Sequence, residues 1–317
     1  MMAWGLRRFA CALAFTSATL SATASDAPAT CDRDIAWQVL GSGGPELNQR
    51  AQSGHVLWID GKARAIFDAG AGTAVAFGKA QGHFEDLDLI ALSHLHTDHT
   101  ADIPAYVKAS FFSERRNDLP ILGPPGNDAF PSLGAWLSAL FSDDHAAYPY
   151  LAGFLQPDGA AYRLRPTTLQ LSEGDIATVF TNPAFNVRAT PVQHGPVPAL
   201  AWRVDVRGRS VVYLGDTDAQ ASALLELAKH ADLLIANLAI SEHGDDDVAS
   251  RLHAPPSRIA ALAQRAGVRR LLLSHLMQRS EQALPESLRV IRSIYRGPVE
   301  VAHDGLCLPL PLRNDAM

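Results

Sequence analysis

A cluster of metal-capable side chains directly behind an apolar segment constrains the fold of this chain more than any other feature. The cluster is the run SHLHTDH over residues 93–99, and the apolar segment LDLIAL precedes it over residues 87–92. A short continuous apolar run of this kind is typical of a strand buried on both faces of an α/β sheet. In extended backbone, residues two apart project to the same side, so His94 and His96 can bind one cation.

Asp98 and His99 come where the chain turns toward a helix, which we expect from Thr100 onward. Adjacent residues diverge at such a turn, so this pair can reach a second cation. Imidazole and carboxylate ligands together suit zinc, and iron and manganese use the same ligand types. A polar loop that merely happens to be rich in histidine is the alternative, and it does not explain why the pattern follows a buried strand. The run therefore predicts a metal site.

The rest of the chain alternates between strand-like and helix-like segments, without a low-complexity linker. Strands are expected over residues 35–40, 55–59, 65–67, 119–122, 176–180, 185–190, 199–206, 210–214, 233–236, 270–273 and 299–302. Helices are expected after Gly72 and over residues 100–112, 129–141, 219–230 (with Asp218 as N-cap), 255–267 and 286–295. Such alternation is typical of sheets covered by helices, so we predict an α/β fold with a single domain over residues 25–317. The aromatic-rich segment 142–165 is expected to form a lid over a pocket, with a surface loop as the alternative.

Three further candidate ligands follow other expected strands. They are His194, Asp216 and His275. A single His or Asp behind a strand is more often a turn or capping residue than a ligand. Together with the first run, however, these residues make five His and two Asp, the complement of a two-metal centre at the strand ends where α/β sheets place their sites. Asp216 can bridge two ions through its two oxygens, whereas histidines outside such motifs, among them His55, are expected to be structural.

The order and spacing of these motifs resemble the metallo-β-lactamase superfamily, and within it the ribonuclease Z and arylsulfatase-type branch. The resemblance runs from about Trp37 to about Asp304. It is carried by LGSGGP (residues 40–45), FDAGAGT (67–73), SHLHTDHTADIP (93–104), GPPG (123–126), PVQHGPVPALAWRV (191–204), YLGDT (213–217) and LLLSHL (271–276). These motifs are specific to the superfamily and much less so to any one substrate.

The resemblance implies a four-layer αββα sandwich with two zinc ions at one edge of its two sheets. The ligands that it implies are His94, His96 and His194 for one ion, Asp98, His99 and His275 for the other, and Asp216 between them. Two such ions share a water molecule and lower its pKa from ~15.7 toward ~7, which yields hydroxide at neutral pH. A remaining oxygen of Asp98 can orient this nucleophile, and the ions stabilise charge that develops on the attacked centre.

The same resemblance implies a proton donor for the leaving group at His253. The ribonuclease Z-like branch keeps a histidine at this place, in RLHAP over residues 251–255, and a surface histidine before a helix is the alternative. The branch also has a His-Glu pair after the strand that corresponds to residues 233–235, where this chain has Ala236 and Asn237. The Glu that would support His253 is therefore missing, and the proton relay departs from the pattern of the branch.

The first 24 residues have the order of a secretory signal peptide. Arg7 and Arg8 are followed by an apolar stretch over residues 9–20 and by Ala22-Thr23-Ala24, so cleavage is expected after Ala24. A membrane anchor is the alternative, but the stretch is too short and too rich in Ser and Thr to span a bilayer. The arginine pair leaves both the general secretory and the twin-arginine routes open. We expect a periplasmic or secreted protein that has no membrane partner.

Cysteine usage fits export. Cys11 would leave with the signal peptide, so that Cys31 and Cys307 would remain. A pair of cysteines in an oxidising compartment favours a disulfide, which would join the segment before the first strand to the last strand. Two buried free thiols are the alternative, because the sequence gives no distance between them.

Charge bears on the partner. The chain has a formal net charge of −6 and no tract of Lys and Arg interleaved with aromatic residues. A protein that binds a long polyanion usually shows a basic patch, so we expect a small-molecule anionic ester as substrate and no large nucleic acid as partner. Arg115 and Arg116, which follow Phe111 and Phe112, could bind an anionic substrate, and an exposed helix end explains them equally well.

Together these features predict an exported dinuclear zinc-dependent hydrolase of a small ester, in first place a phosphodiester, that acts by attack of metal-bound hydroxide. An arylsulfatase is the first alternative, followed by a lactonase and by a β-lactamase, against which the bridging Asp216 weighs. The alternative from a different class is a non-catalytic metal-binding protein. A storage site, however, has no need of an open bridging position between two ions.

Overall fold

The structure is a computed structural model that describes residues 33–142, 145–157, 159–244 and 246–311. The expected signal peptide over residues 1–24 and Cys31 lie outside the described residues. None of the described helices is both long and apolar enough to cross a membrane.

Two seven-stranded sheets form the centre of the described chain. The first sheet has the order β14-β1-β2-β3-β4-β5-β6, with β1 (Ile35–Gly41), β2 (Gly54–Ile59), β3 (Lys62–Ala69), β4 (Leu89–Ala91), β5 (Leu119–Gly123), β6 (Leu164–Thr168) and β14 (Cys307–Pro309). The second sheet has the order β13-β12-β11-β10-β9-β8-β7, with β7 (Ala177–Thr181), β8 (Asn186–His194), β9 (Val197–Val206), β10 (Arg209–Tyr213), β11 (Leu233–Asn237), β12 (Leu271–Ser274) and β13 (Val299–Val301).

The two sheets have the same internal arrangement. In the first, β14, β1, β2 and β3 pair antiparallel, and β3, β4, β5 and β6 pair parallel. In the second, β7, β8, β9 and β10 pair antiparallel, and β10, β11, β12 and β13 pair parallel. Apart from β14, which comes from the end of the chain, the second half of the chain therefore repeats the first half. Each sheet has a parallel part whose strand ends can carry a site.

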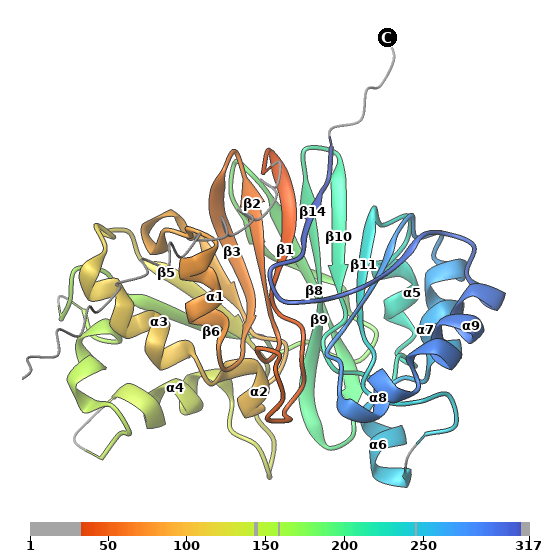
Figure 1. Ribbon diagram of the computed structural model, residues 1–317. Helices are drawn as coiled ribbons and strands as arrows, with labels where there is room; N and C mark the ends of the chain where they lie inside the picture. The colour runs from red at the N-terminus through yellow and green to blue at the C-terminus, as the bar shows by residue number, and fades with distance from the viewer. Residues whose placement is uncertain (1–32, 143–144, 158, 245, 312–317) are drawn as a thin grey trace, which may run out of the picture. The chain divides into compact units, whose positions relative to one another are not determined.

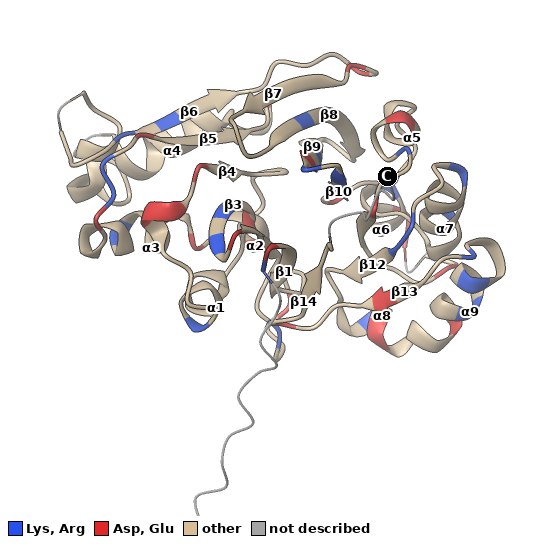
Figure 2. Cartoon of the chain, turned by 90° about the horizontal axis from the view of Figure 1, so that it is seen from above, with Lys and Arg blue, Asp and Glu red and all other residues tan. Residues whose placement is uncertain are grey.

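Helices cover the outer faces of both sheets (Figure 1). They are α1 (Thr73–Lys79), α2 (Thr97–Thr100), α3 (Ile103–Ala109), α4 (Leu133–Phe141), α5 (Ala223–Leu227), α6 (Asp247–Leu252), α7 (Pro256–Arg265), α8 (Gln278–Gln282) and α9 (Leu284–Ile294), with 3-10 turns η1 (Phe84–Asp86), η2 (Ser110–Phe112) and η3 (Pro149–Phe154). Charged residues of both signs are interspersed on helices and turns, whereas the strands are mostly uncharged (Figure 2).

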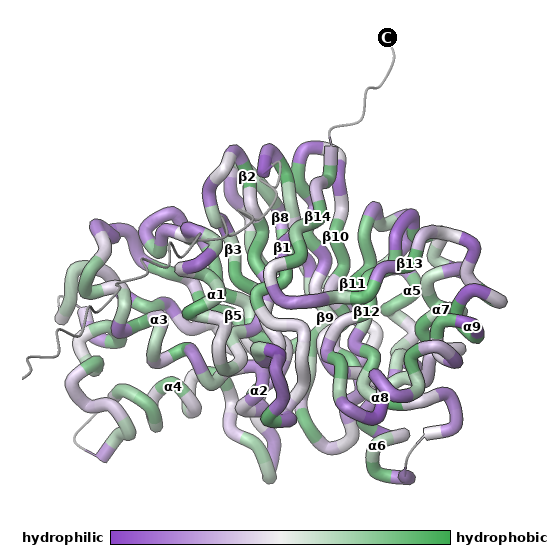
Figure 3. The backbone as a smooth tube through the Cα atoms, viewed as in Figure 1, coloured by the Kyte–Doolittle hydropathy of each residue, from purple (hydrophilic) through white to green (hydrophobic). Residues whose placement is uncertain are grey.

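Three apolar cores separate four layers, and the hydropathy colouring follows them (Figure 3). One core lies between the sheets and includes Trp37 and Trp202, both fully buried. A second joins the first sheet to α1, α3 and α4, and a third joins the second sheet to α5, α7 and α9. The predicted αββα sandwich is therefore confirmed.

Several expected helices are shorter than predicted, for local reasons. The helix expected over residues 100–112 is divided into α2, α3 and η2, because the backbone N–H of Asp102 donates to Ala69 O of β3 instead of continuing the helix. The helix expected from residue 129 begins only after Ser132, whose side chain accepts from the N–H of Ala135. Ser222 rather than Asp218 is the N-cap of α5, and the Asp218 side chain instead accepts from the N–H of Gln220.

The segment expected as a lid, residues 142–165, packs into the core of the first helical layer. Leu151, Phe154 and Tyr162 are buried there beside Phe84. The Tyr162 hydroxyl donates to Ser110 Oγ, which fixes the segment against η2. None of its described residues belongs to the candidate metal groups, and several of them line a separate pocket, so a lid over a pocket stays a prediction.

Candidate metal centre

The predicted ligands come from strand ends and from the short helix that follows β4. His94 and His96 lie between β4 and α2, and Asp98 and His99 lie within α2. The other three lie at the end of β8 or just beyond β10 and β12; they are His194, Asp216 and His275. These segments meet at one edge of the two sheets, where α2, α6 and α8 lie (Figure 1).

The first group of four side chains converges within 4.8 Å; its members are His94, His96, His194 and Asp216. His96 Nδ1 lies 3.0 Å from His94 Nε2 and 3.4 Å from His194 Nε2. Asp216 Oδ2 lies 3.8 Å from His94 Nε2 and 3.7 Å from His194 Nε2. Three imidazole nitrogens and one carboxylate oxygen thus point at one place, which is a donor set that zinc prefers.

The second group, Asp98, His99 and His275, converges beside the first. Asp98 Oδ2 lies 3.1 Å from His275 Nε2 and 3.4 Å from His99 Nε2. Asp216 again faces this group, with its Oδ2 3.5 Å from His99 Nε2 and its Oδ1 3.5 Å from His275 Nε2. Asp216 is therefore placed between the two groups, and the structure brings all seven predicted residues together.

The imidazoles of the centre are oriented by acceptors on their far sides. His99 Nδ1 donates to Asp68 Oδ2 at 2.7 Å, and His194 Nδ1 donates to Leu252 O at 2.8 Å. Ser93 Oγ donates to Asp68, so it accepts from His94 Nδ1 at 3.1 Å. The Nε2 atoms of these rings then face the centre, and His99 Nε2 is buried without a hydrogen bond among the described residues. Such an arrangement suits metal ligands, because their second nitrogen is usually held in this way.

The electrostatics of the centre favour a cation. Burial lowers the pKa of His94 well below its usual value, so this ring is neutral, as a ligand must be. Burial alone would raise the pKa of Asp216, but the nearby charges of His275 and His99 hold that pKa well below its usual range. Burial would lower the pKa of His99, yet Asp98, Asp216 and Asp68 raise it well above its usual value. The residues therefore fit divalent ions, because buried ionised carboxylates and imidazole nitrogens surround a place that attracts positive charge.

His253, the predicted proton donor, lies at the C-cap of α6 beside this centre. Its Nδ1 lies 3.9 Å from Asp216 Oδ2, and its ring centroid is 5.4 Å from that of His194. Burial lowers the pKa of His253 to about 3. Its Nδ1 makes no hydrogen bond among the described residues, and Asn237 donates from Nδ2 to Asp216 Oδ1 at 2.6 Å rather than to His253. Asn237, where the related branch has a Glu that would support His253, therefore supports Asp216 instead.

The sequence reasoning missed Asp68, which is fully buried beneath the centre. Besides His99 and Ser93 Oγ, the N–H of Ser93 and the hydroxyl of Tyr213 donate to its carboxylate, at 2.6 Å and 2.7 Å. Its only signal in the sequence is a position at the end of an expected strand, in FDAGAGT, which is the same signal that marked Asp216.

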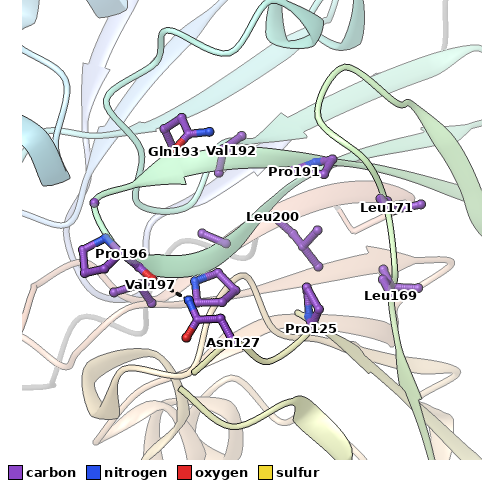
Figure 4. A pocket seen from close by; sticks show the side chains of 13 residues that line it. Pro125, Asn127, Leu169, Leu171, Pro191, Val192, Gln193, Pro196, Val197 and Leu200 are labelled. Atoms are coloured by element: carbon purple, nitrogen blue, oxygen red, sulfur yellow. Dashed lines mark hydrogen bonds between the residues drawn. The ribbon is translucent and has the colours of Figure 1, made fainter. Parts of the chain in front are cut away.

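An apolar pocket of about 220 Å³ lies along the β8–β9 hairpin that carries His194 (Figure 4). Gln193 and Gly195, the chain neighbours of His194, line it, and Asn127 Nδ2 donates to Pro196 O across it at 2.8 Å. None of the seven converging residues lines this pocket. It is therefore a neighbour of the centre rather than a part of it.

Comparison with known proteins shows the family to which the chain belongs. The family model described as a beta-lactamase superfamily domain matches residues 63–276. A protein named ribonuclease Z from Methanosarcina acetivorans is 28% identical over 306 residues, which cover 87% of this chain and 98% of that protein. A ribonuclease Z from Myxococcus xanthus is 27% identical, with 78% of this chain and 89% of that protein covered.

Solved structures show the same fold. The metallo-beta-lactamase fold protein YhfI from Bacillus subtilis superposes with a TM-score of 0.66 at 23% identity, covering 86% of this chain and 98% of that one. The short form of human tRNase Z also gives a TM-score of 0.66 at 23% identity, covering 87% of this chain and 99% of that one. These likenesses extend over the whole sandwich.

The expectation that no large nucleic acid is a partner is contradicted by the comparisons. The relatives that cover most of this chain are named for action on RNA, as is the human structural neighbour. The expectation rested on the net charge of −6 and on the absence of a basic tract in the sequence. Net charge sums over the whole surface, whereas RNA contacts only part of it, so this criterion does not exclude RNA.

The family match and the relatives confirm that the protein is a metal-dependent hydrolase of ester bonds. The identity of the metal and the roles of the single residues remain predictions. The matched segment runs from residue 63 to residue 276 and contains all seven converging residues. The chain belongs to the beta-lactamase superfamily.

Proposed function

We propose that this protein is a phosphodiesterase that works at a dinuclear metal centre and that the phosphodiester bonds of RNA are among its substrates. The observation that carries the proposal is the pair of converging groups that share Asp216. The names of the relatives support the phosphodiester bond as the target, because ribonucleases cleave that bond.

The proposed ions are zinc, with iron and manganese as alternatives of similar ligand preference. His94, His96 and His194 would hold one ion, Asp98, His99 and His275 the other, and Asp216 would contact both. When bound, two such cations supply water of lowered pKa and positive charge for the phosphorus centre.

The chain's own residues have three proposed tasks. Asp98 accepts a hydrogen bond from the attacking water and orients it toward phosphorus. Asp216 keeps the two groups in register, because its two oxygens face different histidines. His253, next to Asp216 and mostly buried, protonates the oxygen of the leaving group, once the negative charge of a bound phosphodiester offsets the burial that lowers its pKa.

The role of His253 predicts a dependence on the leaving group. The substitution His253→Ala leaves all seven converging residues in place, so bound metal should remain near the wild-type value. Hydrolysis of a phosphodiester with an alkoxide leaving group should fall about 10²- to 10⁴-fold, while release of nitrophenolate should fall little, because nitrophenolate leaves without a proton. Equal losses for both esters, or no loss for either, would reject His253 as the acid.

The function itself is tested by a substrate screen with metal-loaded protein. We expect turnover of a bis-nitrophenyl phosphodiester and of an RNA oligonucleotide, and far slower turnover of an aryl sulfate, a lactone and a β-lactam. Asp216→Ala is the matched inactive variant, and it should lose activity toward every substrate together with bound metal. Faster turnover of the sulfate or of the lactone than of either phosphodiester would replace this proposal.

We also propose that the protein is exported, with residues 25–317 as the mature single domain. The support is the order of charge, apolar residues and small residues over residues 1–24. Cell fractionation with N-terminal sequencing tests the proposal, and a mature chain that begins near Ser25 is expected. A cytoplasmic chain that retains Arg7 and Arg8 contradicts it.

A further inference from the structure

An exposed group of aromatic rings lies on the first helical layer, outside the candidate metal centre. This aromatic patch consists of Phe111 and Phe112 in η2, which directly follows α3, and of Tyr148 and Tyr150 around η3. Phe112 is 86% exposed, Tyr150 61% and Phe111 52%. Large aromatic side chains gathered in this way on a surface indicate a binding function rather than a packing function.

A cation lies over the patch. The ammonium group of Lys108 is 4.3 Å from the ring centroid of Phe111, 5.6 Å from that of Tyr150 and 5.9 Å from that of Phe112. Lys108 has no ion pair with an acidic residue in the described ranges, so its charge is available to a ligand. Rings that provide stacking faces beside an available cation match the two components of a nucleotide, its base and its phosphate.

A pocket of about 470 Å³ adjoins the patch. Phe111, Tyr150 and Phe154 form aromatic walls, and Arg116 lines its rim. Arg116 donates from Nη1 to the carbonyl of Arg115 and forms a 3.5 Å ion pair with Glu114. Both side chains of the ion pair are largely exposed, so solvent screens it and a phosphate can replace Glu114. Arg115, by contrast, is buried and donates to the carbonyls of Phe84 and Leu87, so it is a structural residue.

The patch and the candidate metal centre lie on one continuous segment. Asp98 and His99 belong to α2, and α3 leads directly from α2 to the patch (Figure 1). At a rise of about 1.5 Å per residue, α3 alone separates them by about 10 Å, which is about three stacked nucleotides. A ligand that contacts both places is therefore an oligonucleotide rather than a mononucleotide.

We infer that the aromatic patch binds unpaired bases of an RNA substrate, with Lys108 and Arg116 on its phosphates, while the bond to be cleaved lies at the metal centre. This inference rests on the proposed function. A chain of net negative charge can bind RNA in this way, because base stacking supplies affinity that a broad basic surface would otherwise supply.

The inference is tested by the binding of a fluorescent 12-nucleotide oligoadenylate to the full chain, with chelator present so that the RNA stays intact. Phe112→Ala should weaken binding at least about fivefold, because a base loses its stacking partner. Phe112→Trp should retain affinity, whereas Phe112→Leu should behave like Phe112→Ala. The matched control is Val75→Ala, which removes an exposed apolar side chain of α1 outside the patch and should change nothing.

Salt dependence gives a second measurement. Lys108→Gln should reduce the slope of log affinity against log salt concentration by about 0.7, the value for one phosphate contact on a single strand. Hydrolysis of the small bis-nitrophenyl phosphodiester by metal-loaded Phe112→Ala should equal that of the wild type. If that ester is not hydrolysed at all although Phe112 still governs RNA binding, the proposed function fails and the RNA surface stands.

Other occupants of the patch give different results. Wild-type binding of RNA by Phe112→Ala overturns the inference. The inference is also overturned if Phe112→Ala keeps its RNA affinity but no longer binds anionic phospholipid vesicles. The same holds if Phe112→Ala keeps its RNA affinity but changes from a dimer to a monomer. Absence of RNA binding by the wild type overturns it as well.

Discussion

Asp68 concentrates four hydrogen-bond donors on one carboxylate at the base of the candidate metal centre. Its backbone has a φ of 57°, a conformation that most residues avoid but that Asp tolerates. This strain is acceptable because the carboxylate fixes His99 and Ser93 at once. Asp68 is thus a positioning residue, which acts on the centre through the orientation of His99 and, through Ser93, of His94.

Asp68→Asn should weaken metal binding about 10- to 100-fold, the usual cost of losing an outer partner of a ligand. The amide of Asn has only one acceptor oxygen. Its NH₂ group would therefore face either the N–H of Ser93 or the three donors on the other oxygen, and it cannot accept a hydrogen bond from them. Competition with a chelating dye measures the effect, and circular dichroism shows whether the variant is folded. Tyr213→Phe is the control, because it removes one donor and leaves the carboxylate in place. A folded Asp68→Asn protein with wild-type metal affinity would contradict the role.

His55, expected as a structural residue, is fully buried in β2 between Trp37 and Tyr213. Neither ring nitrogen has a hydrogen-bond partner among the described residues. Burial, followed by the charges of His99 and His275, lowers the pKa of His55 from 6.5 to about 3. The folded chain therefore holds this ring neutral under conditions in which the unfolded chain protonates it.

This difference makes stability depend on pH. Because the pKa of His55 is lower in the folded state, the unfolded state binds the proton first, and stability present above pH 6.5 is lost as the pH falls toward 3. Between pH 7 and pH 5 the loss amounts to about 2 kcal/mol in the free energy of unfolding. His55→Phe removes this contribution, so its stability should fall by that much less over the same range. Urea unfolding of both metal-free proteins at the two pH values measures the difference, and parallel losses would disprove it.

At the scale of elements, β14 closes the first sheet and carries the only described cysteine. β14 pairs antiparallel with β1 over three residues, from Gln38↔Cys307 to Ala36↔Pro309. Cys307 is disulfide-bonded. The expected partner, Cys31, lies outside the described residues, so the pairing stays a prediction. A disulfide there would fasten a three-residue strand at the edge of the sheet.

The disulfide predicts a measurable loss on reduction. A cross-link between Cys31 and Cys307 closes a long loop, for which chain entropy gives at most roughly 5 kcal/mol. Mild reduction should therefore lower the free energy of unfolding by a few kcal/mol, and peptide mapping without reductant should recover the two cysteines in one linked peptide. A linked peptide that contains Cys11 instead, or unchanged stability after reduction, would contradict the assignment.

The sequence predicted strands better than helix ends, and the reasons are local. Buried apolar runs such as that of β11 can be recognised without tertiary information. β6 was missed because Arg165 and Pro166 break the apolar pattern, and such a strand is tolerated at the edge of a sheet, where β6 lies. The division between α2 and α3 depends on a bond from Asp102 to Ala69 of another element, so no pattern within the helix could reveal it.

At the scale of the whole molecule, the candidate centre could be predicted because its residues occur in spaced motifs at strand ends. Its supporting contacts could not, because they join distant parts of the chain; Tyr213 and Asp68, for example, are 145 positions apart. Net charge was the least informative property, since it suggested the wrong class of partner. The aromatic patch around Lys108 depends equally on folding, because α3 and η3 are separated by about 40 positions in the sequence.

The converging groups draw residues from both sheets, so bound metal should hold the sheets together. His94, His96, Asp98 and His99 follow β4 of the first sheet. His194 ends β8 of the second sheet, and Asp216 and His275 lie just beyond its strands β10 and β12. Ions that bind only the folded chain stabilise it by about 2.7 kcal/mol per site at a hundredfold excess over Kd.

Removal of metal should therefore lower the Tm of the protein by about 10 °C, if two sites contribute equally. Elemental analysis should find two equivalents of metal before chelation, and thermal unfolding with and without chelator measures the shift. Asp216→Ala is the control: it lacks the residue that faces both groups, so chelator should change its Tm little. One equivalent of metal with full activity would contradict the dinuclear centre. A Tm that is unaffected by chelation would instead show that the two sheets are held by their shared apolar core, in which Trp37 and Trp202 are buried, without a contribution from the ions.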